Sequence, residues 1–268
     1  MRIAILAAAA LLAVAAPPAA AQRGPDPVPI EEWSLEKVSK MGQEIYRHDV
    51  AAWVATDVLL ASFGDGPPPA GMAGWIVVED GDALKVRFLR QEADALKSAF
   101  DIIVRDGRAG PVEAVNGPLS AEESAQFLAR QTAIANIGRL RCSQQMNTVV
   151  IADPDSDDWL VWLLTPMEND RIPIGGHYRF RISADGRTML RRDQLSNGCF
   201  FAERPPEVQR DDAMLFYTQI VSKGPVETHV FLSIQNQLTL VIVAGDRFYS
   251  VGGARIADIT DMVGPEQD

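Results

Sequence analysis

Apolar residues spaced by three and four positions predict helices in the first half of the chain. The first stripe covers residues 35–61 and follows Ser34, a residue type that caps helix starts. A second helix is expected to begin at Ser120, which forms a capping box with Glu123. Residues 92–101 are interpreted as a third helical segment. The sequence therefore indicates two or three helices.

Alternating apolar and polar residues predict strands elsewhere, most of them paired as hairpins. Asp80-Gly81 and Asp185-Gly186 are typical of two-residue hairpin turns. Repeated hairpins favour an antiparallel sheet with helices packed against it. We therefore predict a single α+β domain over residues 30–262, an antiparallel sheet of hairpins with two or three helices packed against it. The predicted strands are residues 75–78, 84–89, 148–151, 159–164, 177–183, 188–194, 228–234, 238–244 and 248–251.

The first 21 residues have the pattern of a secretory signal peptide. Arg2 gives a positive start, residues 3–16 are almost all apolar, and residues 19–21 are the small residues that a signal peptidase requires. The apolar run is shorter than the roughly 20 residues of a spanning helix, so we do not expect a membrane-spanning protein. These features predict a periplasmic or secreted protein whose mature chain begins near Gln22.

Composition narrows the class of partner. The formal net charge is −11 at pH 7, and an acidic chain is repelled by phosphate backbones, so nucleic acid is not an expected partner. Hydrophobic residues make up 47% of the chain, which is enough for a sizeable core. Residues 22–29 and 263–268 are predicted to be a disordered lead-in and tail. We expect a non-enzymatic binding or envelope-associated protein, without a cofactor, whose partner is an unidentified envelope component or protein.

Cys142 and Cys199 are the two cysteines of the chain. In an oxidising compartment an even pair is typical of a disulfide, so we predict a Cys142–Cys199 bond. One bridge does not hold a chain of this size together, and we expect it to support an existing core.

The segment around Cys199 suggests an alternative, enzymatic function. Ser196-Asn197-Gly198-Cys199 resembles the Ser-His-Gly-Cys signature of the L,D-transpeptidases, exported enzymes that cross-link peptidoglycan through a cysteine nucleophile. Asn197 stands where that family has a histidine. The resemblance implies a Cys-dependent acyl-transfer enzyme acting on peptidoglycan, with Cys199 as nucleophile and His177 as its base. That chemistry requires a free Cys199 thiolate.

Six arginines from residue 171 to residue 192 reverse the local charge of this acidic chain. If residues 177–183 form a strand, His177, Arg179 and Arg181 lie on one face, because side chains alternate along a strand. Guanidinium groups on one sheet face suit a carboxylate or phosphate ligand. The hypothesis is an anion-binding site at these three residues. The alternative is that the arginines pair with acids of the protein itself.

Three other patterns contain residue types that bind metals or act in catalysis, but none has the full set of residues that such a site requires. Glu227 and His229 are expected on one side of a strand, where an ordinary surface pair is favoured over a metal or catalytic pair. His48 lies on the apolar stripe of the first helix and is expected to be packed. The acidic residues 153–158 lack the Gly and Glu positions of a calcium-binding EF-hand loop. We therefore predict no metal site.

The signal peptide makes a direct prediction about the mature protein. N-terminal sequencing of protein exported by an expressing cell should begin at or within a few residues of Gln22, in the fraction that is not retained in membranes. Recovery of membrane-bound protein that still begins at Met1 would contradict it.

Overall fold

The structure, a computed structural model, describes residues 28–93, 95–206 and 213–263. These residues form an α+β fold rich in antiparallel strands, which confirms the predicted fold class. The predicted signal peptide and most of the predicted lead-in and tail lie outside the described residues. The helices are α1 (Leu35–Ser62), α2 (Ala121–Ala135), α3 (Glu227–Asn236) and α4 (Thr260–Val263).

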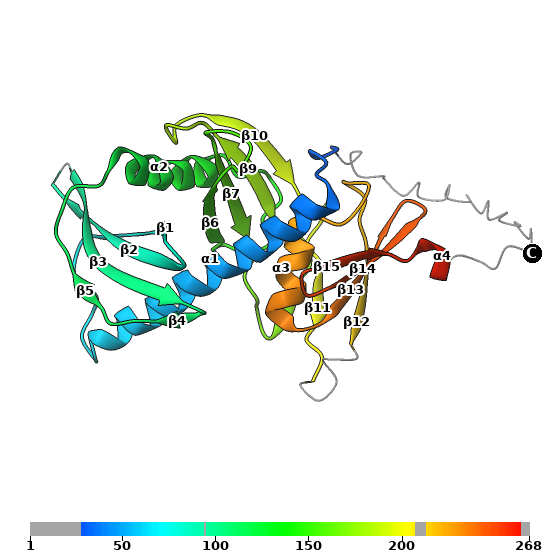
Figure 1. Cartoon of the computed structure of the whole chain (residues 1–268), viewed down its shortest axis with the longest axis horizontal. Coiled ribbons are helices and arrows are strands. Elements are labelled where there is room, and N and C mark those ends of the chain that lie inside the picture. The colour runs from blue at the N-terminus through cyan, green and yellow to red at the C-terminus, as the bar shows by residue number, and fades with distance from the viewer. Residues whose placement is uncertain (1–27, 94, 207–212, 264–268) are drawn as a thin grey trace, which may run out of the picture.

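The two helices expected from their capping residues are present. The Ser34 side chain accepts a hydrogen bond from the backbone N–H of Lys37, at 3.2 Å, and α1 begins at the next residue. Ser120 and Glu123 form the capping box at the start of α2. The long α1 runs diagonally through the molecule and reaches from the N-terminal sheet to the region of α3 (Figure 1).

The N-terminal sheet lies against the second half of α1 (Figure 1). Ala51, Ala55 and Leu59 of α1 share a core with Val86 and other residues of this sheet. The prediction of a helix at residues 92–101 is wrong. That segment ends β2 and forms most of β3, because pairing with the neighbouring strand outweighs its local helix preference. The strands are β1 (Met72–Asp80), β2 (Ala83–Glu92), β3 (Ala95–Arg105), β4 (Arg108–Ala109) and β5 (Glu113–Ala114).

The central sheet is covered on both faces. Val161 and Phe180 pack with Ala129 of α2, whereas Leu160 and Trp162 pack on the opposite side with residues of α1 and α3. Every residue of β7 is consequently buried. The hairpins predicted within residues 148–164 and 177–194 are confirmed. In the antiparallel order β10-β9-β7-β6, the strands are β6 (Asn147–Ala152), β7 (Trp159–Leu164), β9 (Tyr178–Ile182) and β10 (Met189–Gln194).

The C-terminal sheet packs against α3. Residues 228–234, predicted as a strand, belong to α3, so that prediction is wrong. The segment is buried on almost every side, and burial on all sides removes the apolar stripe that reveals a helix in a sequence. β12 runs parallel to β13, and α3 connects the two. This sheet contains β12 (Met214–Thr218), β13 (Thr239–Ala244), β14 (Arg247–Gly252) and β15 (Arg255–Asp258), and a separate pair is β8 (Arg171–Pro173) with β11 (Phe201–Glu203).

The helices α1 and α3 meet in close contact at Gly42. A Cβ atom added there would lie 2.5 Å from Val230 Cβ and 2.7 Å from the carbonyl oxygen of Glu227. A residue without a side chain is therefore needed for the backbones to approach this closely. Gly42 fixes the spacing of the two helices.

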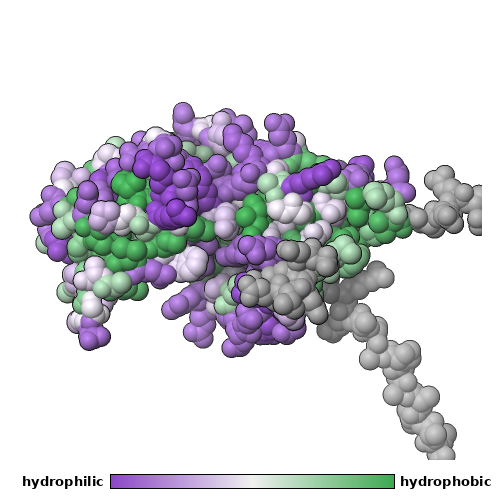
Figure 2. Space-filling model, turned by 60° about the horizontal axis from the view of Figure 1, so that its bottom comes forward, coloured by the Kyte–Doolittle hydropathy of each residue, from purple (hydrophilic) through white to green (hydrophobic). Residues whose placement is uncertain are grey.

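The surface is mostly hydrophilic on the face shown in Figure 2, with hydrophobic patches between the polar residues. Trp53 of α1 and Phe216 of β12 are among the exposed large hydrophobic side chains. Within residues 28–263, apart from the two internal gaps, no helix is both long and apolar enough to cross a bilayer.

The close approach at Gly42 predicts that a single methyl group destabilises the fold. Alanine is favoured over glycine in a helix by about 1 kcal/mol, yet Gly42→Ala should lower the free energy of unfolding by about 1–3 kcal/mol through overpacking. Chemical denaturation measures the change, with Lys40→Ala on the exposed side of α1 as control. A more stable Gly42→Ala protein would show that the helices are not in contact there.

Candidate functional site

Arg179 is the centre of a buried ion-pair network. The residue is 2% exposed and donates hydrogen bonds to Asp193 at 2.7 Å and to Glu227 at 3.1 Å. It also donates to the backbone carbonyl of Glu31 at 2.7 Å, and its guanidinium lies 3.8 Å from the centre of the Trp33 ring. A guanidinium whose charge and donors are satisfied inside the protein does not present them to an external anion.

Arg181 is also paired internally. It donates to Asp153 at 3.1 Å and lies 3.3 Å from a Glu31 carboxylate oxygen, with its side chain 25% exposed. The hypothesis of an anion-binding site at His177, Arg179 and Arg181 needs an accessible sheet face, and the structure leaves neither His177 nor Arg179 accessible. Side chains of β9 alternate as predicted, but the face that carries Arg179 is covered by the segment before α1 and by α3. The structure agrees with the alternative in which the arginines pair with the protein's own acids.

The predicted disulfide is present, with the sulfur atoms of Cys142 and Cys199 bonded at 1.97 Å. In this form Cys199 has no free thiolate, which the acyl-transfer alternative requires. The His177 ring accepts a hydrogen bond from the backbone N–H of Thr165 at 3.1 Å and donates one to the carbonyl of Pro173 at 2.8 Å. Burial lowers the pKa of His177 to about 4. Both ring nitrogens thus have a structural role.

Glu227 and His229 do not form the predicted pair, because residues two apart on a helix point in different directions. Glu227 accepts hydrogen bonds from Trp162 Nε1 at 2.8 Å and from Arg179. The His229 ring accepts one from the backbone N–H of Val226 at 3.1 Å, and burial lowers the pKa of His229 to about 3. Both side chains hold α3 in place.

His48 is packed, as expected, and its Nδ1 donates a hydrogen bond to the carbonyl of Glu44 at 2.9 Å. Its ring nitrogens lie 3.8 Å from carboxylate oxygens of Glu44 and Glu79, which brings three metal-ligating residue types together. Arg47, however, donates hydrogen bonds to both carboxylates. Its guanidinium supplies the positive charge that a metal ion would otherwise provide.

A cavity of about 470 Å³ lies between α1, α3 and the connection from β7 to β8, and we name it the α1–α3 cavity. This volume falls within the range of small-molecule sites, roughly 300–1,000 Å³. Its wall combines aromatic rings with a few polar groups, as such sites do. The wall residues with charged, aromatic or amide side chains include Asp49 and Trp53 of α1, Trp75 of β1, Arg204 after β11, and Phe231 and Gln235 of α3.

Asp49 carries an uncompensated charge in this wall. Within the described parts of the chain, its carboxylate has no hydrogen-bond or ion-pair partner, and burial raises the pKa of Asp49 to about 6. Arg204 is the other ionisable residue of the wall, and it lies 3.3 Å from a carboxylate oxygen of Asp170. Above about pH 6 the cavity therefore contains an unpaired negative charge.

One face of α1 supplies much of the wall. Asp49, Ala52, Trp53 and Thr56 succeed each other at short helical spacings, so they lie along one side of the helix. Trp53 is 63% exposed. Ala52 belongs to the apolar stripe seen in the sequence, whereas Asp49 and Trp53 were not predicted as site residues. The sequence pattern that could have predicted Asp49 and Trp53 is a carboxylate and an indole one helical turn apart, beside the apolar stripe.

The C-terminal end of α3 forms another part of the wall. Gln235 and Asn236 are the last residues of this helix and both line the cavity. The C-terminal end of a helix carries the negative end of its macrodipole. Asn236 is buried, and its Oδ1 atom has no hydrogen-bond partner among the residues that the structure describes. The end of α3 adds to the negative potential created by Asp49.

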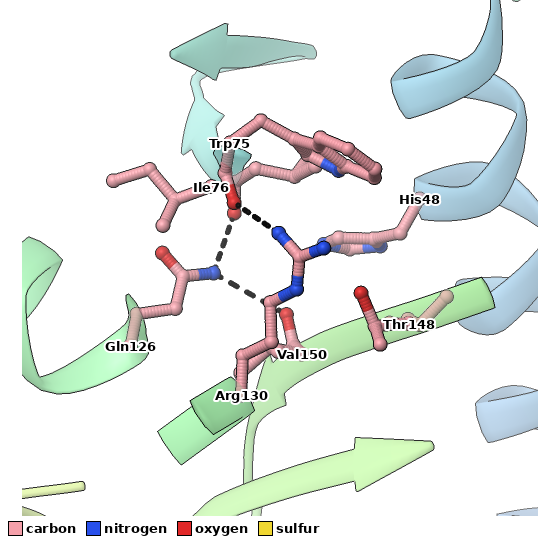
Figure 3. Close-up of a pocket in the computed structure, with 9 residues that line it drawn as sticks. His48, Trp75, Ile76, Gln126, Arg130, Thr148 and Val150 are labelled. Atoms are coloured by element: carbon pink, nitrogen blue, oxygen red, sulfur yellow. Dashed lines mark hydrogen bonds between the residues drawn. The ribbon is translucent and has the colours of Figure 1, made fainter. Parts of the chain in front are cut away.

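A small niche next to this cavity holds Arg130 (Figure 3). It shares Trp75 and Thr148 with the α1–α3 cavity, and its volume of about 20 Å³ accommodates about one water molecule. The guanidinium of Arg130 points between Trp75 and His48 in Figure 3 and lies 4.4 Å from the centre of the Trp75 ring. Burial lowers the pKa of Arg130. Arg130 lines the niche, whereas the larger cavity is lined by other residues.

Comparison of the chain with protein-family models, with curated proteins and with solved structures found no match. The chemistry of the cavity wall is therefore the basis for proposing a function.

The Arg179 network predicts a large effect on stability. Arg179→Met leaves the buried carboxylates of Asp193 and Glu227 without their counter-charge and should lower the free energy of unfolding by about 3–5 kcal/mol. Arg192→Met, on an exposed position of the adjacent β10, should change it by less than about 1 kcal/mol. Urea denaturation of both variants measures the difference. An Arg179→Met protein as stable as the parent would mean that this network does not hold α3 on the sheet.

Mutation of Asp49 should have the opposite effect to mutation of Arg179, namely an increase in the free energy of unfolding. Because the folded-state pKa of about 6 lies above the ordinary value of 3.8, the folded form binds the proton more tightly, and the contribution of Asp49 to stability is lost as pH rises through 6. Asp49→Asn should raise the free energy of unfolding at pH 7.5 by about 1–2 kcal/mol, a value reduced to allow for partial exposure.

The gain from Asp49→Asn should shrink when denaturation is repeated at pH 5, where the parent carboxyl is mostly protonated. Comparing variant with parent at each pH cancels the contributions of His177 and His229, whose lowered pKa values weaken the fold as pH falls below 6.5. Asp57→Asn removes an exposed carboxylate from the same helix and is the matched control. Equal gains for Asp49→Asn and Asp57→Asn would contradict the prediction.

Proposed function

We propose that this chain is an exported, non-enzymatic protein that binds a small molecule in the α1–α3 cavity. The observation that carries the proposal is the unpaired Asp49 carboxylate in a wall that also holds Trp53, Trp75 and Phe231. A half-buried carboxylate without an ion-pair or hydrogen-bond partner among the described residues costs stability when it is charged, and proteins retain such costs at binding sites. Aromatic walls with a small number of polar groups are the common form of ligand sites.

Two features support the export part of this proposal. The N-terminal residues have the pattern of a signal peptide, and the Cys142–Cys199 disulfide is compatible with an oxidising compartment. A small molecule of the periplasm or cell envelope is therefore the expected ligand.

Binding without catalysis fits the composition of the cavity wall. The residues of the wall include no Ser, Cys, His or Lys within the part of the chain that the structure describes. Covalent catalysis uses these side chains or a threonine or carboxylate as nucleophile, and the threonines of this wall have no His or Lys beside them in the lining to act as base. Burial raises the pKa of Asp49 to about 6, and no threonine hydroxyl of the wall is hydrogen-bonded to its carboxylate in the described residues.

The test measures whether small molecules enter the cavity. Saturation-transfer NMR is recorded for three probes that share a phenyl ring and differ in charge: phenethylammonium, 2-phenylethanol and phenylacetate. At least one probe should bind the parent protein. Thr56→Trp, which places an indole in the cavity wall, should abolish that signal.

Leu60→Trp is the matched control, because it adds the same side chain at an exposed position of the same helix. It should bind the probe as the parent does, and circular dichroism verifies that both variants are folded. The proposal is overturned if none of the three probes binds the parent, or if a folded Thr56→Trp protein binds as well as Leu60→Trp.

A further inference from the structure

We infer that the α1–α3 cavity selects an organic cation, and that the alkylammonium or arylammonium group lies between the Asp49 carboxylate and the Trp53 ring. This inference rests on the proposed function and specifies its ligand class. It is based on the charge of the wall, on the spacing of Asp49 and Trp53 along α1, and on the orientation of α3.

The charge of the wall favours a cation. Asp49 and Arg204 are its ionisable residues, and Arg204 pairs through one terminal nitrogen with the exposed carboxylate of Asp170 at 3.3 Å, whereas its Nε has no hydrogen-bond partner among the described residues. The negative charge of Asp49 has no such partner in the described residues. The ammonium group of a ligand would supply a counter-charge to the Asp49 carboxylate. It would also donate hydrogen bonds to that carboxylate, which receives none from the described residues.

The spacing of Asp49 and Trp53 places a carboxylate next to an aromatic ring. Residues four apart on a helix are neighbours on its surface, so both groups can contact one bound cation. The face of an indole attracts cations and is the most effective of the aromatic side chains in doing so. Arg130 already lies over the Trp75 ring, at 4.4 Å from its centre, and Phe231 is buried, whereas the Trp53 ring is exposed and no cation of the described residues lies over it.

The orientation of α3 acts in the same direction. Its C-terminal residues Gln235 and Asn236 line the cavity, so the negative end of the helix macrodipole faces the ligand. Arg130 would oppose a cation, but it lies in the adjoining niche with its guanidinium against Trp75. The negative groups of the wall are therefore Asp49 and the C-terminal end of α3, which lie on the two helices that face each other across the cavity.

The inferred site also has a defined pH dependence. Phenethylammonium stays protonated from pH 5 to pH 7.5, so a change in its affinity over this range reports the protein. Asp49, with its pKa of about 6, loses its proton within the range, and affinity should rise about tenfold. Among the other titratable groups on α1 and in the wall, burial lowers the pKa of His48, Glu44 is paired with Arg47, and Arg204 lies 3.3 Å from Asp170.

The experiment is a titration of the parent protein and three variants with phenethylammonium, 2-phenylethanol and phenylacetate by isothermal calorimetry at pH 5 and pH 7.5. At pH 7.5 the parent should bind phenethylammonium at least about tenfold more tightly than 2-phenylethanol. Asp49→Asn should remove this preference and the pH dependence, whereas the control Asp57→Asn should keep both. Trp53→Leu should weaken phenethylammonium binding about threefold.

The outcomes separate this inference from the proposed function. Equal affinities for the cation and the alcohol, tighter binding of phenylacetate, or an unchanged preference in Asp49→Asn would each overturn the cation inference. In those cases the proposed function would still be supported if a probe binds the parent protein and Thr56→Trp abolishes that binding. Failure of all three probes to bind the parent would overturn both.

Discussion

The buried ion pair between Arg179 and Glu227 is the interaction on which the arrangement of this fold depends. It joins the central sheet to the first residue of α3, and the ring of Trp33 covers it from the N-terminal side. Separating two buried opposite charges is costly, so α3 has a fixed position on the sheet. Gly42 then allows α1 to lie directly against α3. The α1–α3 cavity lies between these two helices and the connection from β7 to β8.

The buried Glu227 and the half-buried Asp49 differ in whether the protein balances their charge. Glu227 has its charge balanced by Arg179 and its oxygens occupied by hydrogen bonds, so it contributes to folding. Asp49 lies in a cavity wall with neither kind of partner among the described residues, and burial raises its pKa. This contrast between a fully paired and an unpaired carboxylate is the basis of the ligand-binding role that we propose for Asp49.

Local patterns predicted much of the fold, and long-range packing accounts for what they missed. Ser34 and Ser120 marked helix starts correctly because capping involves residues three apart. The alternation around Arg179 was also right, but alternation does not reveal which face another element covers. The sequence pattern of α3 failed because the helix is buried almost all round. The cavity joins residues as distant as Asp49 and Gln235, which no local pattern brings together.

The most direct test of this account is the pKa of Asp49 with and without a bound cation, measured by NMR on protein labelled at the aspartate side-chain carboxyl carbon. The account predicts a pKa of about 6 in the free protein, because the carboxylate is largely buried and unpaired. Saturation with phenethylammonium should lower it, because an opposite charge stabilises the ionised form. A pKa near the ordinary 3.8 in the free protein, unchanged by phenethylammonium, would contradict the account.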